Sequence, residues 1–244
     1  MRNETLVVIP ARYGSTRFEG KVLAPLKGRM VVEWCHRAAV AAAIGPVVVA
    51  TEDARVARAV AAFGGRAVMT SARCVSGTDR VFEAAKRFDC RFILNLQGDE
   101  PLIKSSTLKA VAGLLRGRTG AAMSTAVVAL RESSRAHDPN LVKAVVAQDG
   151  RALYFSRAPI PFPRGKAPAR YFQHIGIYGF TRSALARFVR LPPSPLEKTE
   201  SLEQLRALED GMPIYAAVVA DRTVAIDTPE DLLRANKVLN ARRK

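Results

Sequence analysis

Two adjacent carboxylates, Asp99 and Glu100, stand just after an apolar run of strand length, Phe92 to Leu96, in the middle of the chain. Such a run predicts a buried strand, and ligands of open α/β sheets bind at the carboxyl ends of the strands. Mg²⁺ takes oxygen ligands, and it combines one or two protein carboxylates with water and substrate phosphates. The segment Gln97 to Pro101 therefore predicts a magnesium ligand at the edge of a sheet. Asp99 is the better candidate, because the proline that follows Glu100 favours a turn.

A basic, glycine-containing loop follows the first apolar run of the chain. Residues 10–21 carry Arg12, Arg17 and Lys21 together with two glycines and two small hydroxyl side chains. Glycines let backbone N–H groups approach an anion, and the basic side chains neutralise its charge. The loop differs from a Walker A motif, since Val22 follows the lysine where Ser or Thr would stand. It predicts a phosphate-binding loop of another type.

The elements that position these residues follow an alternating pattern. Apolar runs at 6–10, 47–50, 67–69 and 92–96 predict strands, and helical periodicity at 31–43, 54–63 and 78–88 predicts the helices between them. Two-sided apolar strands alternating with helices indicate an α/β fold with a doubly wound, mostly parallel sheet. After about residue 138 the pattern becomes β-rich, with an Asp149-Gly150 hairpin signal. We expect one domain, 1–244, with a β-rich lobe in its second half.

Composition limits the class of protein. The formal net charge of +16 suits nucleic acid or small polyanionic substrates. Nucleic acid is disfavoured, because the chain has no zinc-finger, RNP or KH motif and its basic residues are dispersed. Three scattered cysteines argue against a disulfide framework or a zinc site. The absence of a signal peptide and of a long apolar run predicts a soluble, cytoplasmic protein without membrane insertion.

Several short motifs occur in order along nearly the whole chain. They are IPARY at 9–13, STR at 15–17, GK at 20–21, SGTDR at 76–80, QGDEPL at 97–102, ALYFSRA at 152–158, HIGIY at 174–178, LEQLR at 202–206 and DTPEDL at 227–232. In this order they resemble the 3-deoxy-manno-octulosonate (Kdo) cytidylyltransferases, or CMP-Kdo synthetases. The last motifs are more specific than the first, which many sugar-nucleotide transferases share.

The resemblance implies a fold, a reaction and an assembly. The fold would be nucleotide-diphospho-sugar transferase-like, with a nucleotide-binding half at 1–137 and a sugar-binding and dimerisation half at 138–244. The reaction would join CTP and Kdo to give CMP-Kdo and pyrophosphate, for lipopolysaccharide or capsule synthesis. Mg²⁺ would be the cofactor and the protein would be a homodimer.

The resemblance also implies roles for individual residues. Those expected at the nucleotide are Ala11, Arg12, Ser15, Lys21, Ser76 and Arg80. Those expected at the sugar are Gln97, Arg157, His174, Tyr178, Glu203 and Gln204. Asp99 and Asp227 would hold the metal, and together with Arg12 and Lys21 they would form the catalytic set. Two of these residues have structural alternatives, because His174 also suits a packed core and Asp227 also suits a helix cap.

The phosphate loop departs from the family pattern. Phe18 and Glu19 stand where the family usually has Leu-Pro, and Val22 stands in place of a second proline. The loss of two prolines loosens the loop, and Glu19 places a negative charge near the expected triphosphate. Two alternatives stay open: the same chemistry on 8-amino-Kdo or another acidic sugar, such as a sialic acid, and a non-catalytic relative that binds nucleic acid or regulates.

Overall fold

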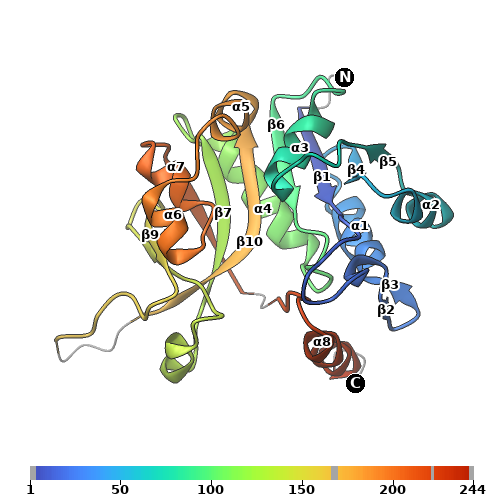
Figure 1. The fold of residues 1–244 in the computed structure, drawn as a ribbon. Coiled ribbons are helices and arrows are strands. Elements are labelled where there is room, and N and C mark those ends of the chain that lie inside the picture. The colour runs from blue at the N-terminus through green and yellow to red at the C-terminus, as the bar shows by residue number, and fades with distance from the viewer. Residues whose placement is uncertain (1–3, 166–169, 221–222, 242–244) are drawn as a thin grey trace. The chain divides into compact units, whose positions relative to one another are not determined.

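A computed structural model describes residues 4–165, 170–220 and 223–241 (Figure 1). The chain divides into two compact units, residues 1–109 with 222–244, and residues 110–221. The first division falls inside helix α4, Ser105–Gly117. The C-terminal segment belongs with the N-terminal unit, so the limits of these units differ from the expected boundary at residues 137 and 138. The expectation of a single domain stays a prediction.

The first unit contains a parallel sheet. Its strands, in the order β6-β1-β4-β5, are Phe92–Leu96, Thr5–Pro10, Val47–Thr51 and Ala67–Met69. Every residue of β1 and β6 is buried, which explains why the sequence shows continuous apolar runs here rather than alternation. All four strands lie within a residue of their predicted positions.

Helices join these strands in the expected manner. They are α1 Val31–Ala42, α2 Ala54–Ala62 and α3 Gly77–Ala85, and short elements η1 Lys21–Leu23, β2 Pro25–Leu26 and β3 Arg29–Met30 precede α1. The last helix of the unit is α8, Pro229–Ala241. Ile226 lies just before α8 and Ala235 lies within it. Both are fully buried in one cluster with Leu26, Val31 and Leu102. This apolar cluster joins the C-terminal segment to the rest of the first unit.

The second unit is the β-rich part of the chain, as predicted. Its elements are β7 Met123–Ala129, η2 Ser133–His137, β8 Lys143–Val146, β9 Ala152–Ser156, β10 Phe172–Thr181, α5 Arg182–Phe188, α6 Pro195–Glu200, α7 Leu205–Glu209 and β11 Ile214–Val219. β7 lies between β11, to which it is parallel, and β10, to which it is antiparallel. β8 and β9 form a hairpin, and β8 also pairs with β10. The predicted α/β class with a mostly parallel sheet is confirmed by the match to a solved structure reported below.

Two features of the second unit carry no clear signal in the sequence. β10 is the longest of the described strands, but its apolar residues are interrupted by glycine and polar side chains. α7 begins only at Leu205, and Ser201 has a left-handed backbone (φ 53°) that ends α6. A helix cannot continue through such a residue.

None of the helices in residues 4–165, 170–220 and 223–241 is long and apolar enough to cross a bilayer.

The buried ammonium group of Lys143 connects two segments of the second unit by hydrogen bonds. Lys143 is fully buried, and its Nζ donates to the carbonyl oxygens of Asp138 (2.9 Å), Leu141 (2.6 Å) and Arg157. Burial lowers the pKa of Lys143. The three carbonyls satisfy its three protons, so this side chain joins the loop before β8 to the end of β9.

We expect Lys143→Met to lower the free energy of unfolding by about 3 kcal/mol, because it leaves three buried carbonyls without their charged donor. Urea denaturation measures this change. Lys109→Met, at an exposed position of α4, removes the same charge and is expected to stay within about 0.5 kcal/mol of wild type. Equal stability of Lys143→Met and wild type would show that the carbonyl contacts contribute little.

Candidate functional site

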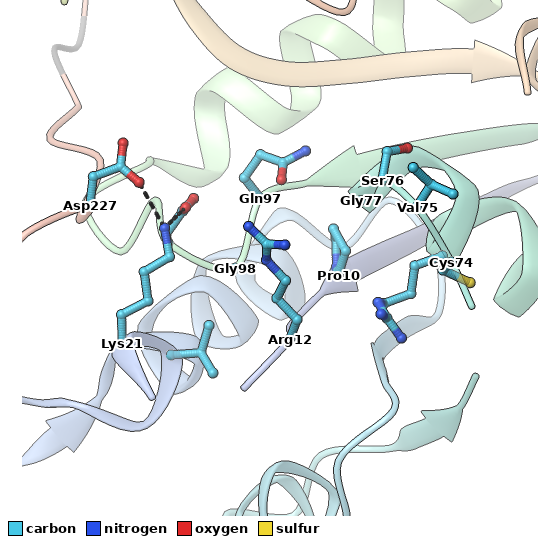
Figure 2. A pocket seen from close by; sticks show the side chains of 13 residues that line it. Pro10, Arg12, Lys21, Cys74, Val75, Ser76, Gly77, Gln97, Gly98 and Asp227 are labelled. Atoms are coloured by element: carbon cyan, nitrogen blue, oxygen red, sulfur yellow. Dashed lines mark hydrogen bonds and ion pairs between the residues drawn. The ribbon is translucent and has the colours of Figure 1, made fainter. Parts of the chain in front are cut away.

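A pocket of about 280 Å³ lies in the first unit, where the loops after β1 and β6 meet (Figure 2). It is lined by Pro10, Arg12, Lys21, Val22, Cys74, Val75, Ser76, Gly77, Arg80, Gln97, Gly98, Asp99 and Asp227. The pocket therefore sits at the carboxyl ends of parallel strands, where the sequence predicted a ligand site.

The loop after β1 forms one side of this pocket. The N–H of Gly20 donates to the carbonyl of Tyr13 (2.9 Å), which closes the loop, and Gly20 has φ 67°, a conformation that suits glycine. The guanidinium of Arg55 lies over the ring of Tyr13, with its Cζ atom 3.4 Å from the ring centroid. Arg12 is exposed and lines the pocket, whereas Ser15 belongs to the same loop but lies outside the pocket lining.

The departures from the family pattern have clear positions. Phe18 is partly buried and packs on the apolar cluster beneath α8, so it is an anchor of the loop rather than a pocket residue. Val22 is buried. Glu19 is exposed and raises the pKa of Arg55, after the larger effect of Asp53. Arg17 pairs with Asp227 rather than with Glu19.

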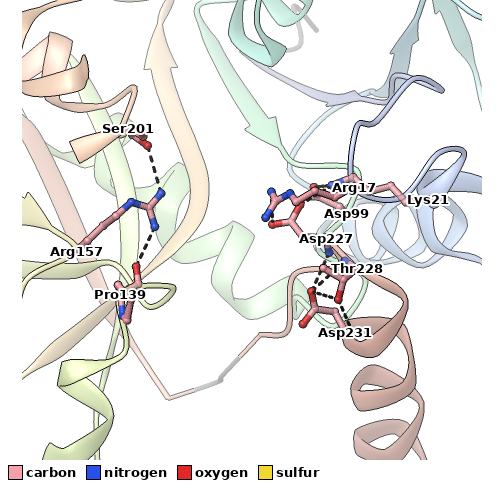
Figure 3. A network of polar contacts seen from close by, with 9 residues as sticks. All are labelled: Arg17, Lys21, Asp99, Pro139, Arg157, Ser201, Asp227, Thr228 and Asp231. Carbon is pink, nitrogen blue, oxygen red and sulfur yellow. Dashed lines mark hydrogen bonds and ion pairs between the residues drawn. The ribbon is translucent and has the colours of Figure 1, made fainter. Parts of the chain in front are cut away.

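Lys21 is the centre of the polar network in the pocket (Figure 3). Its Nζ lies 2.6 Å from Asp99 Oδ2 and 2.8 Å from Asp227 Oδ1, and Arg17 Nη2 lies 3.1 Å from Asp227 Oδ2. Burial opposes the charge of Lys21, but the carboxylates of Asp99 and Asp227 outweigh it and raise its pKa. Burial likewise opposes the charge of Asp227, while Lys21 and Arg17 lower its pKa overall.

Close backbone contacts hold the two carboxylates in place. A Cβ on Gly98 would lie 2.7 Å from the carbonyl oxygen of Pro10, so the turn that carries Asp99 needs glycine at this position. The N–H of Ile226 donates to the carbonyl of Asp99 (2.9 Å), which fixes the segment before Asp227 beside that turn.

The helix-cap alternative for Asp227 does not hold. The cap of α8 is formed by Thr228 and Asp231: Asp231 Oδ2 accepts from the N–H groups of Asp227 (3.2 Å) and Thr228 (3.1 Å), and Thr228 Oγ1 accepts from the N–H of Asp231 (3.3 Å). The Asp227 carboxylate is therefore directed to Lys21 and Arg17 instead.

The donor set fits a magnesium ion only in combination with a substrate. The carboxylates of Asp99 and Asp227 converge on one cationic centre, the ammonium of Lys21. Within the described residues no group of three or more His, Cys, Asp or Glu side chains could hold a metal. Two carboxylates suffice for Mg²⁺ when phosphate oxygens and water complete its shell. Glu100, the neighbour of Asp99, is buried, and burial raises its pKa to about 8.

The far end of the pocket is built by α3. Ser76 caps this helix by accepting from the N–H of Asp79 (3.1 Å), and Arg80 is buried, with Nη1 at 2.6 Å from Thr70 Oγ1 and 2.8 Å from Glu52 Oε2. Gln97, expected at the sugar, lines this same pocket and donates to Asn95 Oδ1 (3.0 Å).

Some residues of the site were not predicted. Glu52 pairs with Arg80, and Cys74 and Val75 line the pocket. Arg17 was expected only as a basic residue of the phosphate loop, and it pairs with Asp227. Val75 is 91% exposed although it is apolar. The available signal was position, since Cys74 and Val75 directly precede the SGTDR motif. Ala11 is buried, its N–H donates to the carbonyl of Ala50 (2.9 Å), and it lies outside the pocket lining.

His174 and Tyr178 lie together in the second unit. β10 has a bulge between Ile175 and Tyr178, and the two rings lie 5.4 Å apart although three residues separate them along the strand. The hydroxyl of Thr125 donates its single proton to the carbonyl of Ile177 (2.8 Å), with the carbonyl of Ile175 also near (3.3 Å). Since this proton is used, His174 Nε2, 2.8 Å from the same hydroxyl oxygen, acts as the donor there and carries the imidazole proton. Burial lowers the pKa of His174 to about 3, and burial together with Glu203 raises that of Tyr178.

Arg157 binds main-chain carbonyls (Figure 3). Its guanidinium donates to the carbonyls of Glu200 (2.8 Å), Pro139 (2.9 Å) and Ser201 (3.4 Å), which uses three of its five N–H groups. The Nε2 of Gln204, which is buried, has no hydrogen-bond partner within the described part of the chain. These two residues retain donors that a ligand would satisfy.

The fold and the pocket define a class: an α/β protein with a basic loop and paired carboxylates at the strand ends, as nucleotidyltransferases need. Comparison with known proteins is more specific. Residues 6–214 match the family described as Cytidylyltransferase. The 3-deoxy-manno-octulosonate cytidylyltransferase of Elusimicrobium minutum is 50% identical over 97% of this chain and 98% of its own, and that of Synechococcus elongatus is 46% identical over 95% and 96%.

A solved structure agrees with these relatives. The structure of CMP:2-keto-3-deoxy-manno-octonic acid synthetase complexed with CTP matches with a TM-score of 0.93 and 39% identity, over 98% of this chain and 99% of the other. The chain belongs to the 3-deoxy-manno-octulosonate cytidylyltransferase family, and it is a nucleotidyltransferase.

The burial of neutral His174 predicts a specific pH dependence of stability. Its pKa is about 3 in the folded state, against an ordinary value of 6.5, so below pH 6.5 the unfolded chain binds a proton that the folded chain excludes. Wild type should therefore lose about 1.5 kcal/mol more than His174→Gln between pH 6.5 and pH 5, measured by urea denaturation at both values. Parallel losses in the two proteins would mean that His174 accepts its proton while folded.

Proposed function

We propose that this chain transfers CMP from CTP to Kdo, with Mg²⁺ as cofactor, and releases pyrophosphate. The observation that carries the proposal is the convergence of Asp99, Asp227 and Lys21 beside the loop that bears Arg12. Relatives named for this activity cover nearly the whole chain, which supports the choice of nucleotide and sugar. We also propose a homodimer and a cytoplasmic location, as the resemblance implied.

The basic residues of the pocket would bind the triphosphate. In the reaction a hydroxyl oxygen of the sugar attacks the α-phosphorus, the bond to the β-phosphate breaks, pyrophosphate leaves and the hydroxyl proton passes to water. Arg12 and Lys21 would neutralise the negative charge of the phosphates and of the leaving pyrophosphate. Ser15 would contribute from the same loop, and Ser76, Arg80 and the backbone at Ala11 would lie near the nucleoside. No protein nucleophile is required.

Asp99 and Asp227 would hold the metal. A magnesium ion held by these residues would supply charge neutralisation and would lower the pKa of a hydroxyl group bound to it. Both carboxylates are partly exposed, 24% and 38%, and their positions are fixed by the backbone contacts of Gly98 and Ile226. The chain thus positions the ligands before any substrate arrives.

The remaining expected residues are proposed to bind the sugar. These are Gln97, Arg157, His174, Tyr178, Glu203 and Gln204. Arg157 keeps two N–H groups that suit a sugar carboxylate, and the uncharged His174 keeps Nδ1 as an acceptor. We propose Kdo rather than 8-amino-Kdo as the substrate, because Phe18, a departure from the family pattern, packs on the apolar cluster of the first unit and does not line the pocket.

Pyrophosphate release with CTP and a panel of acidic sugars tests this function. We expect release with Kdo and much less with 8-amino-Kdo or a sialic acid. If another acidic sugar gave faster pyrophosphate release than Kdo, that sugar would be assigned as the substrate instead. A protein that releases pyrophosphate with none of them and binds RNA in a salt-sensitive way would support the non-catalytic alternative.

Asp99→Asn tests the role of the carboxylates. We expect turnover to fall at least about a hundredfold, because an amide is a poor ligand for Mg²⁺ and leaves Asp227 as the single carboxylate beside Lys21. The matched control is Asp53→Asn, which makes the same chemical change at the N-cap of α2, where Asn also serves. Near-normal turnover of a folded Asp99→Asn protein would refute the proposed metal ligand.

A further inference from the structure

Lys21 occupies the position between the carboxylates that a cation would take. Its ammonium lies 2.6 Å from Asp99 Oδ2 and 2.8 Å from Asp227 Oδ1, so one group bonds both acidic side chains at once. The Lys21 side chain is only 11% exposed, and Arg17 covers the outer oxygen of Asp227 at 3.1 Å. Two protein cations therefore already neutralise the pair of carboxylates.

A divalent ion cannot join this arrangement without displacing Lys21. Mg²⁺ binds carboxylate oxygens at 2.0–2.1 Å and needs near-octahedral geometry. An ion bridging the same oxygens would lie against the ammonium, and two cations at such a distance repel each other strongly in a partly buried site. The free protein should consequently bind the metal weakly.

A bound triphosphate would supply the force that moves Lys21. Lys21 follows Gly20, at the end of the closed loop, and the flexible stem of its side chain carries the ammonium that contacts the carboxylates. A triphosphate bound by this basic loop would offer negative oxygens to the ammonium as a second partner. Arg17, which is 65% exposed, can turn to the phosphates in the same way.

We propose that Lys21 is an internal counter-cation, which closes the metal site of the nucleotide-free protein and opens it by moving to the triphosphate. This inference rests on the proposed magnesium-dependent function. It makes nucleotide and metal binding mutually dependent: each ligand increases the affinity of the other by the same factor, as linkage requires. Lys21 thus acts twice, first as a stand-in for the metal and then as a ligand of the phosphates.

Binding of Mn²⁺ alone, without nucleotide, tests the proposal. Free Mn²⁺ is measured by electron paramagnetic resonance in titrations of wild type and Lys21→Met. We expect Lys21→Met to bind one Mn²⁺ at least about tenfold more tightly, because two neighbouring carboxylates without a counter-cation attract a divalent ion. Arg17→Met should give a smaller gain, since Arg17 contacts only Asp227.

Two control variants locate the effect. Lys109→Met makes the same charge change at an exposed position of α4 and should bind Mn²⁺ like wild type. Lys21→Met combined with Asp99→Asn should lose the gain, which assigns the bound ion to the carboxylate pair. Lys21→Gln provides the same test should Lys21→Met not fold.

The proposal is overturned if a folded Lys21 variant binds Mn²⁺ with the same affinity as wild type. This result does not affect the proposed transfer of CMP, which fails separately if no acidic sugar releases pyrophosphate from CTP. The two ideas can therefore be rejected independently.

Discussion

The ion pairs of Lys21 with Asp99 and Asp227 are the interaction on which the site depends. They join three segments that are far apart in sequence: the loop after β1, the turn after β6 and the segment before α8. Because each member is partly buried, removal of one charge would leave the others only partly compensated. The arrangement holds the three segments together and brings together the groups that the proposed metal–nucleotide complex needs.

Backbone contacts give this charged centre its geometry. Gly98 lets the turn of Asp99 pass close to the carbonyl of Pro10, and the Ile226–Asp99 hydrogen bond holds the C-terminal segment against that turn. Thr228 and Asp231 cap α8 and leave the carboxylate of Asp227 available. The apolar cluster that contains Ile226 and Ala235 then keeps the C-terminal segment in the first unit.

Sequence reasoning predicted the parts of this protein that depend on local pattern. Continuous apolar runs located β1, β4, β5 and β6, and the position of Asp99 after β6 indicated its role. Asp227 could be connected with Asp99 only through a family resemblance, since no periodicity relates residues 128 positions apart. The burial of Glu100 and Phe18, the carbonyl contacts of Arg157 and Lys143, and the bulge in β10 are tertiary features, and a single sequence carries no signal for them.

The central claim is that Asp99 and Asp227 share one cation, whose identity changes when substrate binds. A crystal structure with Mn²⁺ and CTP, with an anomalous difference map, tests it most directly. The account predicts a manganese peak between the two carboxylates, with Lys21 Nζ withdrawn from both and in contact with phosphate oxygens. A manganese ion elsewhere, with the contacts of Lys21 to Asp99 and Asp227 intact, would contradict it.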